Sequence, residues 1–185
     1  MIKTKRDLKN CIKADADANE RKNKKGNFRN FLLYEHLYLN WKFIKLLRKD
    51  EYYTNNNSGM NKLMYIIVRR RKNKLARKLG FTIPVNVFAE GLRIWHYGNI
   101  VVNGYARVGK NCILHGDNCI GNNGFSTKAP QIGNNVDVGV GAKIIGDIKI
   151  ADGIVIGANS VVNKSFLEPN VVIAGVPAKV IKKIN

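Results

Sequence analysis

Hydrophobic residues recur at every sixth position through the C-terminal half of the chain. The aliphatic residues of this series are Val102, Val108, Leu114, Ile120, Ile132, Val138, Ile144, Ile150, Ile156 and Val162. Only Ser126 interrupts the register. A period of six differs from the 3.6 residues of a helix and from the two residues of a half-buried strand. The pattern therefore predicts short strands wound repeatedly around one axis.

The same period predicts the shape of each coil. If every hexad supplies one short strand and one turn, three hexads form a triangular coil of about 18 residues, and the aliphatic residues point into a prism. Glycine often follows the aliphatic position, which suits a tight corner that needs unusual dihedral angles or close backbone approach. These glycines are Gly109, Gly121, Gly133, Gly139 and Gly157. Small or apolar residues recur two positions before it, at Ala106, Cys112, Gly124, Val136, Ala142, Ile148, Ile154 and Ser160. Stacked coils pair their backbones and leave open edges only at the two ends.

One hexad is replaced by the segment NNGFSTKAPQ. The aliphatic series stops at Ile120 and resumes in register at Ile132. We expect a loop that leaves the wall of the prism, and loops on a rigid scaffold often carry binding groups. A tolerated irregularity is the alternative.

The N-terminal part has a different periodicity. The segments FLLYEHLYLNWKFIKLLRK and MNKLMYIIVRRRKNKLARKL place apolar residues three and four apart, which predicts helices, and EYYTNNNSGMN between them predicts a loop. Pro84 and Gly91 end helical continuity before the repeat. We therefore divide the chain into a basic α-helical region (1–80), a repeat domain (81–164) and a closing segment (165–185). The helices and the closing segment could cover the two ends of the prism.

Charge is concentrated in the helical region. The formal net charge is +19 over 185 residues, and residues 1–80 carry 22 Lys and Arg against 7 Asp and Glu. Such a surface would attach to polyanions in a salt-dependent way. No recognised nucleic-acid motif accompanies the charge, so we expect no specific nucleic-acid partner. An anionic membrane or glycan would explain the charge equally well, and a merely solvated helical surface is the third alternative.

Location and cysteine chemistry are less informative. No apolar stretch reaches the roughly 18 residues needed to cross a bilayer, and MIKTKRDLKNCIKADADANE lacks the apolar core of a signal peptide, so a cytoplasmic location is expected. Cys11, Cys112 and Cys119 show no metal-binding spacing, and we interpret them as small buried or free thiols.

Two of the three histidines are placed where chemistry could occur. His96 and His115 are nineteen residues apart, one coil plus one residue, so we expect them near the same corner on neighbouring coils. An imidazole can accept a proton from a hydroxyl near neutral pH. Spacing alone is equally compatible with one structural and one catalytic histidine. His36 is interpreted as a helix-packing or surface residue.

Several motifs in the repeat carry a family resemblance. The segments HYGNIVVNGYARVGKNCILHGDNCIG, IGNNVDVGVGAKIIGDIKIADGIVIGANSVVNKS and AGVPAKVI resemble hexapeptide-repeat acyltransferases, in particular serine acetyltransferases and related enzymes of polysaccharide gene clusters. The resemblance covers residues 81–185 and implies a mainly β fold, a left-handed parallel β-helix, in a homotrimer. It also implies acetyl-CoA as co-substrate and no metal. DLKNCIKADADA and WKFIKLLRKDEYY resemble the polysaccharide-associated group less distinctively.

The resemblance implies roles for both histidines. His96 would be the general base, and His115 would orient the acceptor or a water. The family's orienting aspartate corresponds to Phe81, so Glu90, Asp117 or a main-chain carbonyl would have to orient His96. A second family histidine, which helps to bind serine, corresponds to Ala129. These two losses favour a sugar over L-serine as acceptor.

The resemblance also implies a donor site. The pantetheine arm of the cofactor would lie against small residues that let main-chain groups reach it. Ala142 and Ser160, one coil apart, match these contacts. Asn163, Lys164 and Lys179 would meet the distal part of the cofactor, where ammonium groups pair with phosphates. Tight corners and solvated surface charges are the ordinary roles of the same residue types.

Two hypotheses follow. The first is a trimeric acetyl-CoA-dependent O-acetyltransferase that acts on a hydroxyl of L-serine or of a sugar in surface polysaccharide biosynthesis. The second is a catalytically silent β-helix that serves as a binding or scaffold module. His96 and the pair Lys164 and Lys179 argue against the second, because a silent prism has no need for them.

Overall fold

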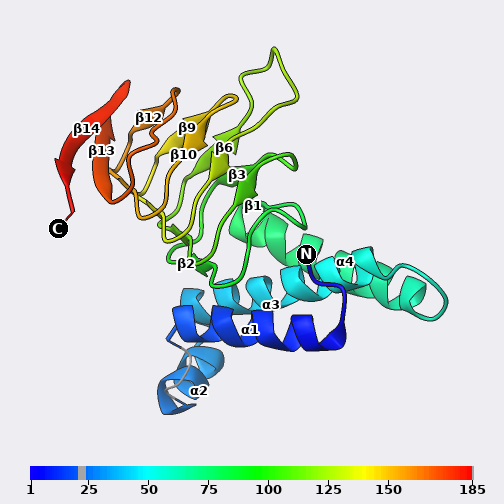
Figure 1. Ribbon diagram of the computed structural model, residues 1–185. Helices are drawn as coiled ribbons and strands as arrows, with labels where there is room; N and C mark the ends of the chain where they lie inside the picture. Colours follow the sequence, from blue (N-terminus) through cyan, green and yellow to red (C-terminus); the bar gives the residue numbers. More distant parts are fainter. Residues whose placement is uncertain (21–23, 185) are drawn as a thin grey trace.

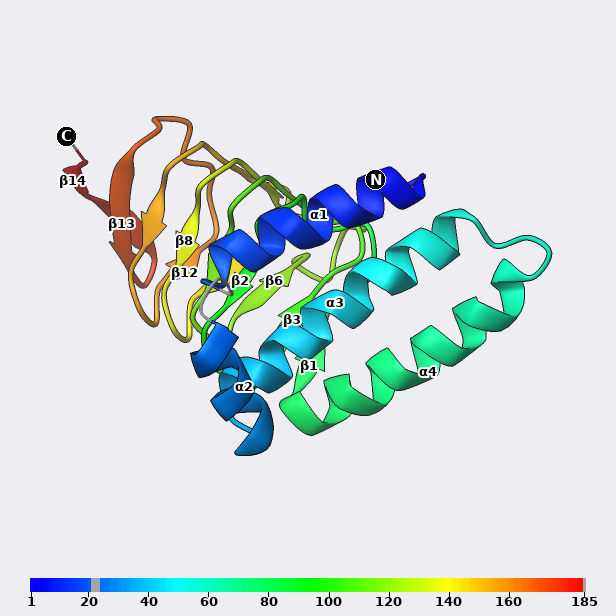
Figure 2. The same ribbon diagram turned by 90° about the horizontal axis from the view of Figure 1, so that it is seen from below.

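The computed structural model describes residues 1–20 and 24–184 and consists of a helical region attached to one end of a three-sided prism (Figure 1). The helices are α1 (Lys5–Ala18), α2 (Lys24–Leu32), α3 (His36–Asn55) and α4 (Asn61–Leu79). Figure 2 shows α1, α3 and α4 side by side across the end of the prism, with α3 and α4 forming a hairpin. The helical character of the N-terminal part is therefore confirmed, but its bounds differ from those expected. The segment 31–49 is divided between α2 and α3, and α3 continues to Asn55, so the connecting loop is shorter than EYYTNNNSGMN.

Local sequence explains where two of these helices begin and end. Thr4 and Asp7 form a capping box at α1, because the Thr4 hydroxyl accepts from the Asp7 N–H at 3.0 Å and the Asp7 carboxylate accepts from the Thr4 N–H at 2.8 Å. Gly80 ends α4 in the left-handed conformation, with φ of 77°.

Three parallel sheets form the walls of the prism. The first sheet has the order β1-β3-β6-β9-β12, the second β10-β7-β4, and the third β14-β13-β11-β8-β5-β2. The strands up to β7 are β1 (Phe81–Thr82), β2 (Arg93–Ile94), β3 (Ile100–Val102), β4 (Arg107–Val108), β5 (Ile113–Leu114), β6 (Cys119–Gly121) and β7 (Gln131–Ile132). The remaining strands are β8 (Asp137–Val138), β9 (Lys143–Ile145), β10 (Lys149–Ile150), β11 (Val155–Ile156), β12 (Val161–Val162), β13 (Val171–Gly175) and β14 (Ala178–Lys183).

The hexad register agrees with this architecture. Every aliphatic residue of the series from Val102 to Val162 is buried, with at most 5% of its surface exposed. Val102 pairs with Ile120, and Ile144 pairs with Val162. The partners in each pair are 18 residues apart, which is the expected length of one coil. The coil between them is longer, because Ile120 pairs with Ile144. The additional six residues form the loop that leaves the wall after β6.

Of the two roles expected for glycine at the corners, close backbone approach and unusual dihedral angles, the structure shows the first for the glycines that follow the aliphatic residues. The glycines that follow the aliphatic residues are needed for close approach: a Cβ on Gly109 would lie 2.5 Å from the Gly133 carbonyl oxygen, and one on Gly139 would lie 2.7 Å from that of Ile156. Left-handed dihedrals at the corners fall instead on residues such as Asn111, with φ of 56°. Asparagine tolerates this conformation better than most residues.

Both ends of the prism are covered. The ring of Phe43 in α3 packs against that of Phe81 at a centroid distance of 5.0 Å, and one continuous hydrophobic core runs from α3 to β13. At the far end, β13 pairs parallel with β11, and β14 then pairs antiparallel with β13. Because the helices share the core of the prism, the division at residue 80 stays a prediction.

Candidate active site

His96 lies on an enlarged corner of the first coil. The inward residues Ile94 and Val102 are eight positions apart, whereas Leu114 and Ile120 at the same corner of the next coil are six apart. Two additional residues therefore enter the turn that carries His96, and they lift its side chain into an exposed position. They also change the expected register, because β2 pairs with β5 so that Ile94 faces Leu114.

His115 lies at the same corner of the next coil, where it contacts two side chains. The His115 Nε2 atom is 2.8 Å from Asp137 Oδ1, and both side chains are 35% exposed. The Trp95 ring stacks on the imidazole at 6.2 Å, and the Arg93 guanidinium lies 3.8 Å from the centroid of the Trp95 ring. A carboxylate on one ring nitrogen fixes the orientation of an imidazole. The oriented histidine of this corner is thus His115.

The two histidines are neighbours, as the coil spacing predicted. A Cβ built on Gly116, the residue after His115, would lie 3.4 Å from the His96 Cβ. The next residue along that turn, Asp117, pairs with Lys143 at 3.4 Å.

Helix α3 contacts the His96 corner with two side chains. The His36 imidazole stacks on that of His96 at 5.7 Å with an interplanar angle of 24°, and it also contacts the Tyr97 ring edge-on at 6.3 Å. One turn further along α3, the buried Asn40 donates its amide N–H groups to the carbonyl oxygens of Ile94 and Trp95, at 3.2 and 3.1 Å. The main chain that leads into His96 is therefore hydrogen-bonded to α3.

Sequence reasoning missed two of these contacts. His36 was expected on a surface or in helix packing, and the structure instead stacks it on His96. Its spacing of four from Asn40 was the available signal, since residues four apart share a helix face. Asp137 faces His115 across adjacent coils, which the coil length could have indicated once the loop was counted.

The groups expected to orient His96 are engaged elsewhere. Glu90 pairs with Lys110 at 2.8 Å, and that hydrogen bond lowers the pKa of the Glu90 carboxyl. Asp117 pairs with Lys143. The positions that correspond to the two lost family side chains are both apolar and buried, Phe81 against Phe43 and Ala129 with 2% exposure. Both carboxylates are thus paired with lysines, and the choice of Glu90, Asp117 or a main-chain carbonyl as orienting group stays a prediction.

The residues expected at the donor lie along the same edge of the prism. Ala142 and Ser160 are one coil apart, and the Lys143 N–H donates to the Ser160 carbonyl at 2.8 Å. Both residues are fully buried. The Ser160 hydroxyl accepts from the Gly175 N–H at 3.2 Å, which joins this edge to the β13–β14 hairpin.

The charged donor residues are exposed and spread over two elements. Asn163 and Lys164 follow β12, with the Lys164 ammonium 5.6 Å from the centroid of the Phe166 ring. Lys179 lies in β14, opposite Ala174 of β13. The hairpin thus brings Lys179 near the Ser160 edge.

Comparison with known proteins identifies the family. No family model matches the chain. The serine acetyltransferase of Helicobacter pylori strain J99 is 35% identical over 129 residues, which cover 68% of this chain and 75% of that protein. The chain belongs to the serine acetyltransferase family. The enzyme of Buchnera aphidicola is 35% identical over 104 residues, or 55% of this chain and 40% of that protein.

Solved serine acetyltransferases share the fold. The enzyme of Brucella abortus strain S19 is 25% identical with a TM-score of 0.75, over 95% of this chain and 69% of that one. The soybean apoenzyme is also 25% identical, with a TM-score of 0.70, over 94% and 69% of the two chains. The present serine acetyltransferase homologue spans less than half the length of the first curated relatives it matches, 40% of the Buchnera protein and 43% of that from Mycobacterium tuberculosis.

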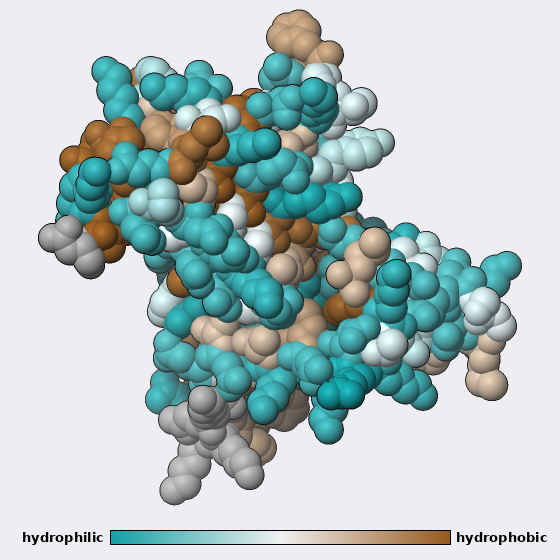
Figure 3. All heavy atoms as spheres, in the orientation of Figure 1, coloured by the Kyte–Doolittle hydropathy of each residue, from teal (hydrophilic) through white to brown (hydrophobic). Residues whose placement is uncertain are grey.

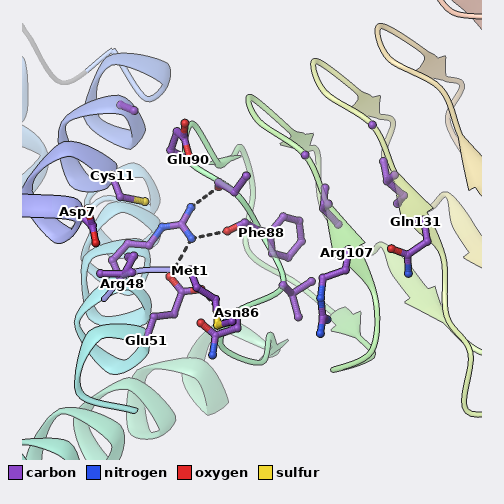
Figure 4. A pocket seen from close by; sticks show the side chains of 18 of the residues that line it. Met1, Asp7, Cys11, Arg48, Glu51, Asn86, Phe88, Glu90, Arg107 and Gln131 are labelled. Carbon is purple, nitrogen blue, oxygen red and sulfur yellow. Dashed lines mark hydrogen bonds and ion pairs between the residues drawn. The ribbon is translucent and has the colours of Figure 1, made fainter. Parts of the chain in front are cut away.

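One hollow of this family member lies away from the histidines. A groove of about 890 Å³ separates α1 from the outer face of β4, β7 and β10, with Cys11 and Glu90 on one side and Arg107 and Gln131 on the other (Figure 4). Neither histidine of the corner lines it. Burial raises the pKa of the Cys11 thiol to about 12, so this thiol stays protonated at neutral pH.

A buried ion-pair network forms the floor of this groove. Arg48 pairs with Glu51 at 3.0 Å and donates to the carbonyl of Phe88 at 2.7 Å (Figure 4). It also pairs with Asp15 at 2.8 Å. Burial opposes the charge, but Asp15 and Glu51 outweigh it and raise the pKa of the Arg48 guanidinium. Asp15 also accepts from the Gly91 N–H at 2.8 Å. The network thus connects α1 and α3 to the segment that enters the prism.

Other candidate chemistry is limited. The cysteines are free, with Cys112 buried and Cys11 and Cys119 partly buried, which confirms their interpretation as buried or free thiols. Within residues 1–20 and 24–184, no cluster of three His, Cys, Asp or Glu side chains is suited to hold a metal ion. Among these same residues, no helix combines the length and apolar character needed to span a membrane.

Proposed function

We propose that the protein is an acetyl-CoA-dependent O-acetyltransferase that acetylates a hydroxyl of L-serine or of a sugar used in surface polysaccharide biosynthesis. The observation that carries the proposal is the placement of His96 and the Asp137-bound His115 at the same corner of successive coils, in a chain of the serine acetyltransferase family. The proposal includes the left-handed winding of the coil, a cytoplasmic location and a homotrimer.

The exposed His96 is proposed as the general base. Its unprotonated ring nitrogen takes the proton of the acceptor hydroxyl while the oxygen attacks the thioester carbonyl carbon. The tetrahedral intermediate then collapses, the C–S bond breaks, and the imidazolium returns the proton to the leaving coenzyme A thiolate. His36 and Asn40 are proposed to position this ring in place of the family aspartate, since they contact the imidazole and its main chain.

His115 is proposed to orient the acceptor. Its Nε2 atom is paired with Asp137, which leaves the Nδ1 atom for a bond to a second hydroxyl or a water. Because an imidazole paired with a carboxylate is also a suitable base, the roles of His96 and His115 must be separated by experiment.

Two observations bear on the acceptor. Curated relatives are named serine acetyltransferases, and a solved one from Neisseria gonorrhoeae is described in complex with serine. The apolar Phe81 and Ala129 occupy the places of the family aspartate and of the histidine that helps to bind serine, which supports a sugar. Both acceptors therefore belong in the test.

The donor is proposed to lie along the Ser160 edge. A related structure from Brucella abortus is described in complex with coenzyme A. Main-chain groups at Ala142 and Ser160 would contact the pantetheine arm, and Asn163, Lys164 and Lys179 would meet the phosphates. Ammonium groups form charge-assisted bonds with phosphate oxygens.

The experiment is acetyl transfer by the purified chain, followed through release of free coenzyme A thiol. L-Serine and nucleotide-linked or free sugars are offered in turn, and mass spectrometry identifies the acetylated product. We expect His96→Asn to lower kcat by roughly 10²- to 10⁴-fold, the usual contribution of a general base. His115→Asn is expected to raise the KM for the acceptor more than it lowers kcat.

The outcomes separate the alternatives. If only His115→Asn lowered kcat, His115 would be the general base and His96 would orient the acceptor. Bound coenzyme A without thiol release for any hydroxyl acceptor would contradict O-acetyl transfer and favour a binding or scaffold module.

A further inference from the structure

The outward face of α4 carries exposed apolar side chains over its first two turns. Leu63 is 61% exposed and Ile66 46%, and Met60 just before the helix is 87% exposed. Met64 is 38% exposed in the same stretch. Side chains of this kind, gathered on one helix end, are a larger apolar surface than single scattered residues provide.

The rest of α4 is strongly basic. The helix contains eight Lys or Arg residues and no Asp or Glu. Arg69 and Lys72 pair with the buried Asp50 of α3, at 3.1 and 2.8 Å. The other six cations are exposed, namely Lys62, Arg70, Arg71, Lys74, Arg77 and Lys78.

The apolar and the basic parts share one face of the helix. At 3.6 residues per turn, Leu63, Arg70, Lys74 and Arg77 lie within one side, opposite the buried Leu75. In Figure 1 and Figure 2 the α3–α4 hairpin projects from the prism, and Figure 3 shows this arm covered mainly by hydrophilic side chains with hydrophobic ones toward its outer end. The face is therefore of mixed apolar and cationic character.

We propose that this α4 face docks on an anionic phospholipid surface. The lysine and arginine side chains would lie among the headgroup phosphates, and Leu63 with Ile66 would enter the boundary between headgroups and acyl chains. The long stems of the cations can lie along apolar material while their charges remain at the headgroups. This inference does not depend on acetyl transfer.

Lipid fits this face better than nucleic acid or a second copy. Phosphate contacts of nucleic acid would use the cations and leave Leu63 and Ile66 in water. Two copies aligned along α4 would place basic on basic if parallel, and basic on apolar if antiparallel, and like charges in contact cost several kcal/mol. A bilayer surface offers phosphate and hydrocarbon together.

Docking would also bring the His96 corner near the lipid. The basic end of α4 is hydrogen-bonded to that corner, because the Gly98 N–H donates to the Leu79 carbonyl at 2.9 Å. An acceptor attached to a lipid would thus meet the proposed base without leaving the bilayer surface.

The test is co-sedimentation of the full chain with vesicles of phosphatidylcholine alone or mixed with phosphatidylglycerol, over a series of salt concentrations. The charge variant is Arg70→Gln with Lys74→Gln and Arg77→Gln, and the apolar variant is Leu63→Ser with Ile66→Ser. The matched control removes the same charge from exposed positions on α1, through Lys5→Gln, Arg6→Gln and Lys9→Gln. Circular dichroism checks the helical content of each variant, and light scattering checks its mass.

We expect binding to the anionic vesicles that weakens with salt, and little binding to phosphatidylcholine. The charge variant should bind about tenfold or more weakly, since each cation at a membrane surface contributes on the order of 1 kcal/mol. The apolar variant should lose the binding that persists at high salt, and the α1 control should bind nearly as the native chain does. Equal losses in the control and the charge variant would overturn the proposal, because the attraction would then be a property of net charge.

Two further outcomes would also overturn it. In the first, duplex DNA displaces the vesicles and binds the apolar variant as tightly as it binds the native chain. In the second, the apolar variant has a lower mass in solution than the native chain, which would show that α4 forms a contact between copies.

Discussion

At the scale of residues, helix α3 contacts the His96 corner, where the family has an orienting aspartate, and we propose that it positions His96. The family aspartate corresponds to Phe81, whose ring is buried against Phe43. One turn away, Asn40 donates to the Ile94 and Trp95 carbonyls, and His36 stacks on the imidazole. The Asn40 Oδ1 atom is buried without a hydrogen-bond partner among residues 1–20 and 24–184. Such an atom is costly, so the position of this amide is defined by its two donor bonds.

These contacts predict a kinetic effect of Asn40→Leu. Without the amide, the carbonyls that precede His96 lose their donors and the corner can shift, and a displacement of about 1 Å can cost on the order of 100-fold in rate. We expect kcat to fall at least tenfold with little change in the KM for acetyl-CoA. Steady-state kinetics over a range of pH gives both quantities.

The control for this prediction lies on the same helix. Asn55 donates to the Ile2 carbonyl at 3.0 Å, far from His96 along α3. Asn55→Leu should reduce stability and leave kcat unchanged. Equal kcat for Asn40→Leu and Asn55→Leu would contradict a role of α3 in the positioning of His96.

A second prediction concerns His36. A phenylalanine ring should retain the stacking on His96 that alanine removes, so His36→Phe should keep more activity than His36→Ala.

At the scale of elements, the loop between β6 and β7 is an insertion that the prism accommodates without losing register. The Asn122 side chain donates to the Ser126 carbonyl at 2.6 Å, and Lys128 pairs with Asp147 at 3.0 Å. Phe125 is 97% exposed at its tip. Exposed loop tips tolerate changes of length, since few buried groups depend on them.

Deletion of residues 123–128 should therefore preserve the fold. The change restores a coil of about 18 residues, and the strands on both sides keep their inward residues Ile120 and Ile132. We expect a melting temperature within a few degrees of that of the full chain, measured by circular dichroism. A cooperative transition lost on deletion would show instead that the loop supports the wall of the prism.

At the scale of the whole molecule, the walls of the prism differ in polarity. The outer face of the second sheet carries the exposed Arg107, Gln131 and Lys149. The first sheet presents Val101, 47% exposed, and the half-buried Ile145. An apolar wall of this kind is typical of a contact between subunits.

This asymmetry predicts the assembly and its most sensitive face. Light scattering should give a mass three times that of the 20.8 kDa chain. Val101→Asp should lower that mass, because a charge enters the apolar contact, whereas Gln131→Asp on the polar wall should not. A native mass of one chain would contradict the trimer.

The sequence alone determined the repeating architecture and the site's general location. A period of six has one simple physical solution, since the inward residues must be aliphatic and each coil must align with the next, and this indicated the three-walled prism and the adjacency of His96 and His115. Periodicity likewise identified the long helical segments and the loop after Ile120. These features are local, and hydrophobic burial enforces them along the chain.

Tertiary structure alone decided which groups surround the histidines. His36 and Asn40 reach the His96 corner because α3 packs across the end of the prism, and Asp137 reaches His115 because the intervening coil is six residues longer. Glu90 and Asp117 are held by the nearer cations Lys110 and Lys143. The period specifies which residues point inward, but the partners of outward side chains depend on how separate elements meet, which no local pattern records.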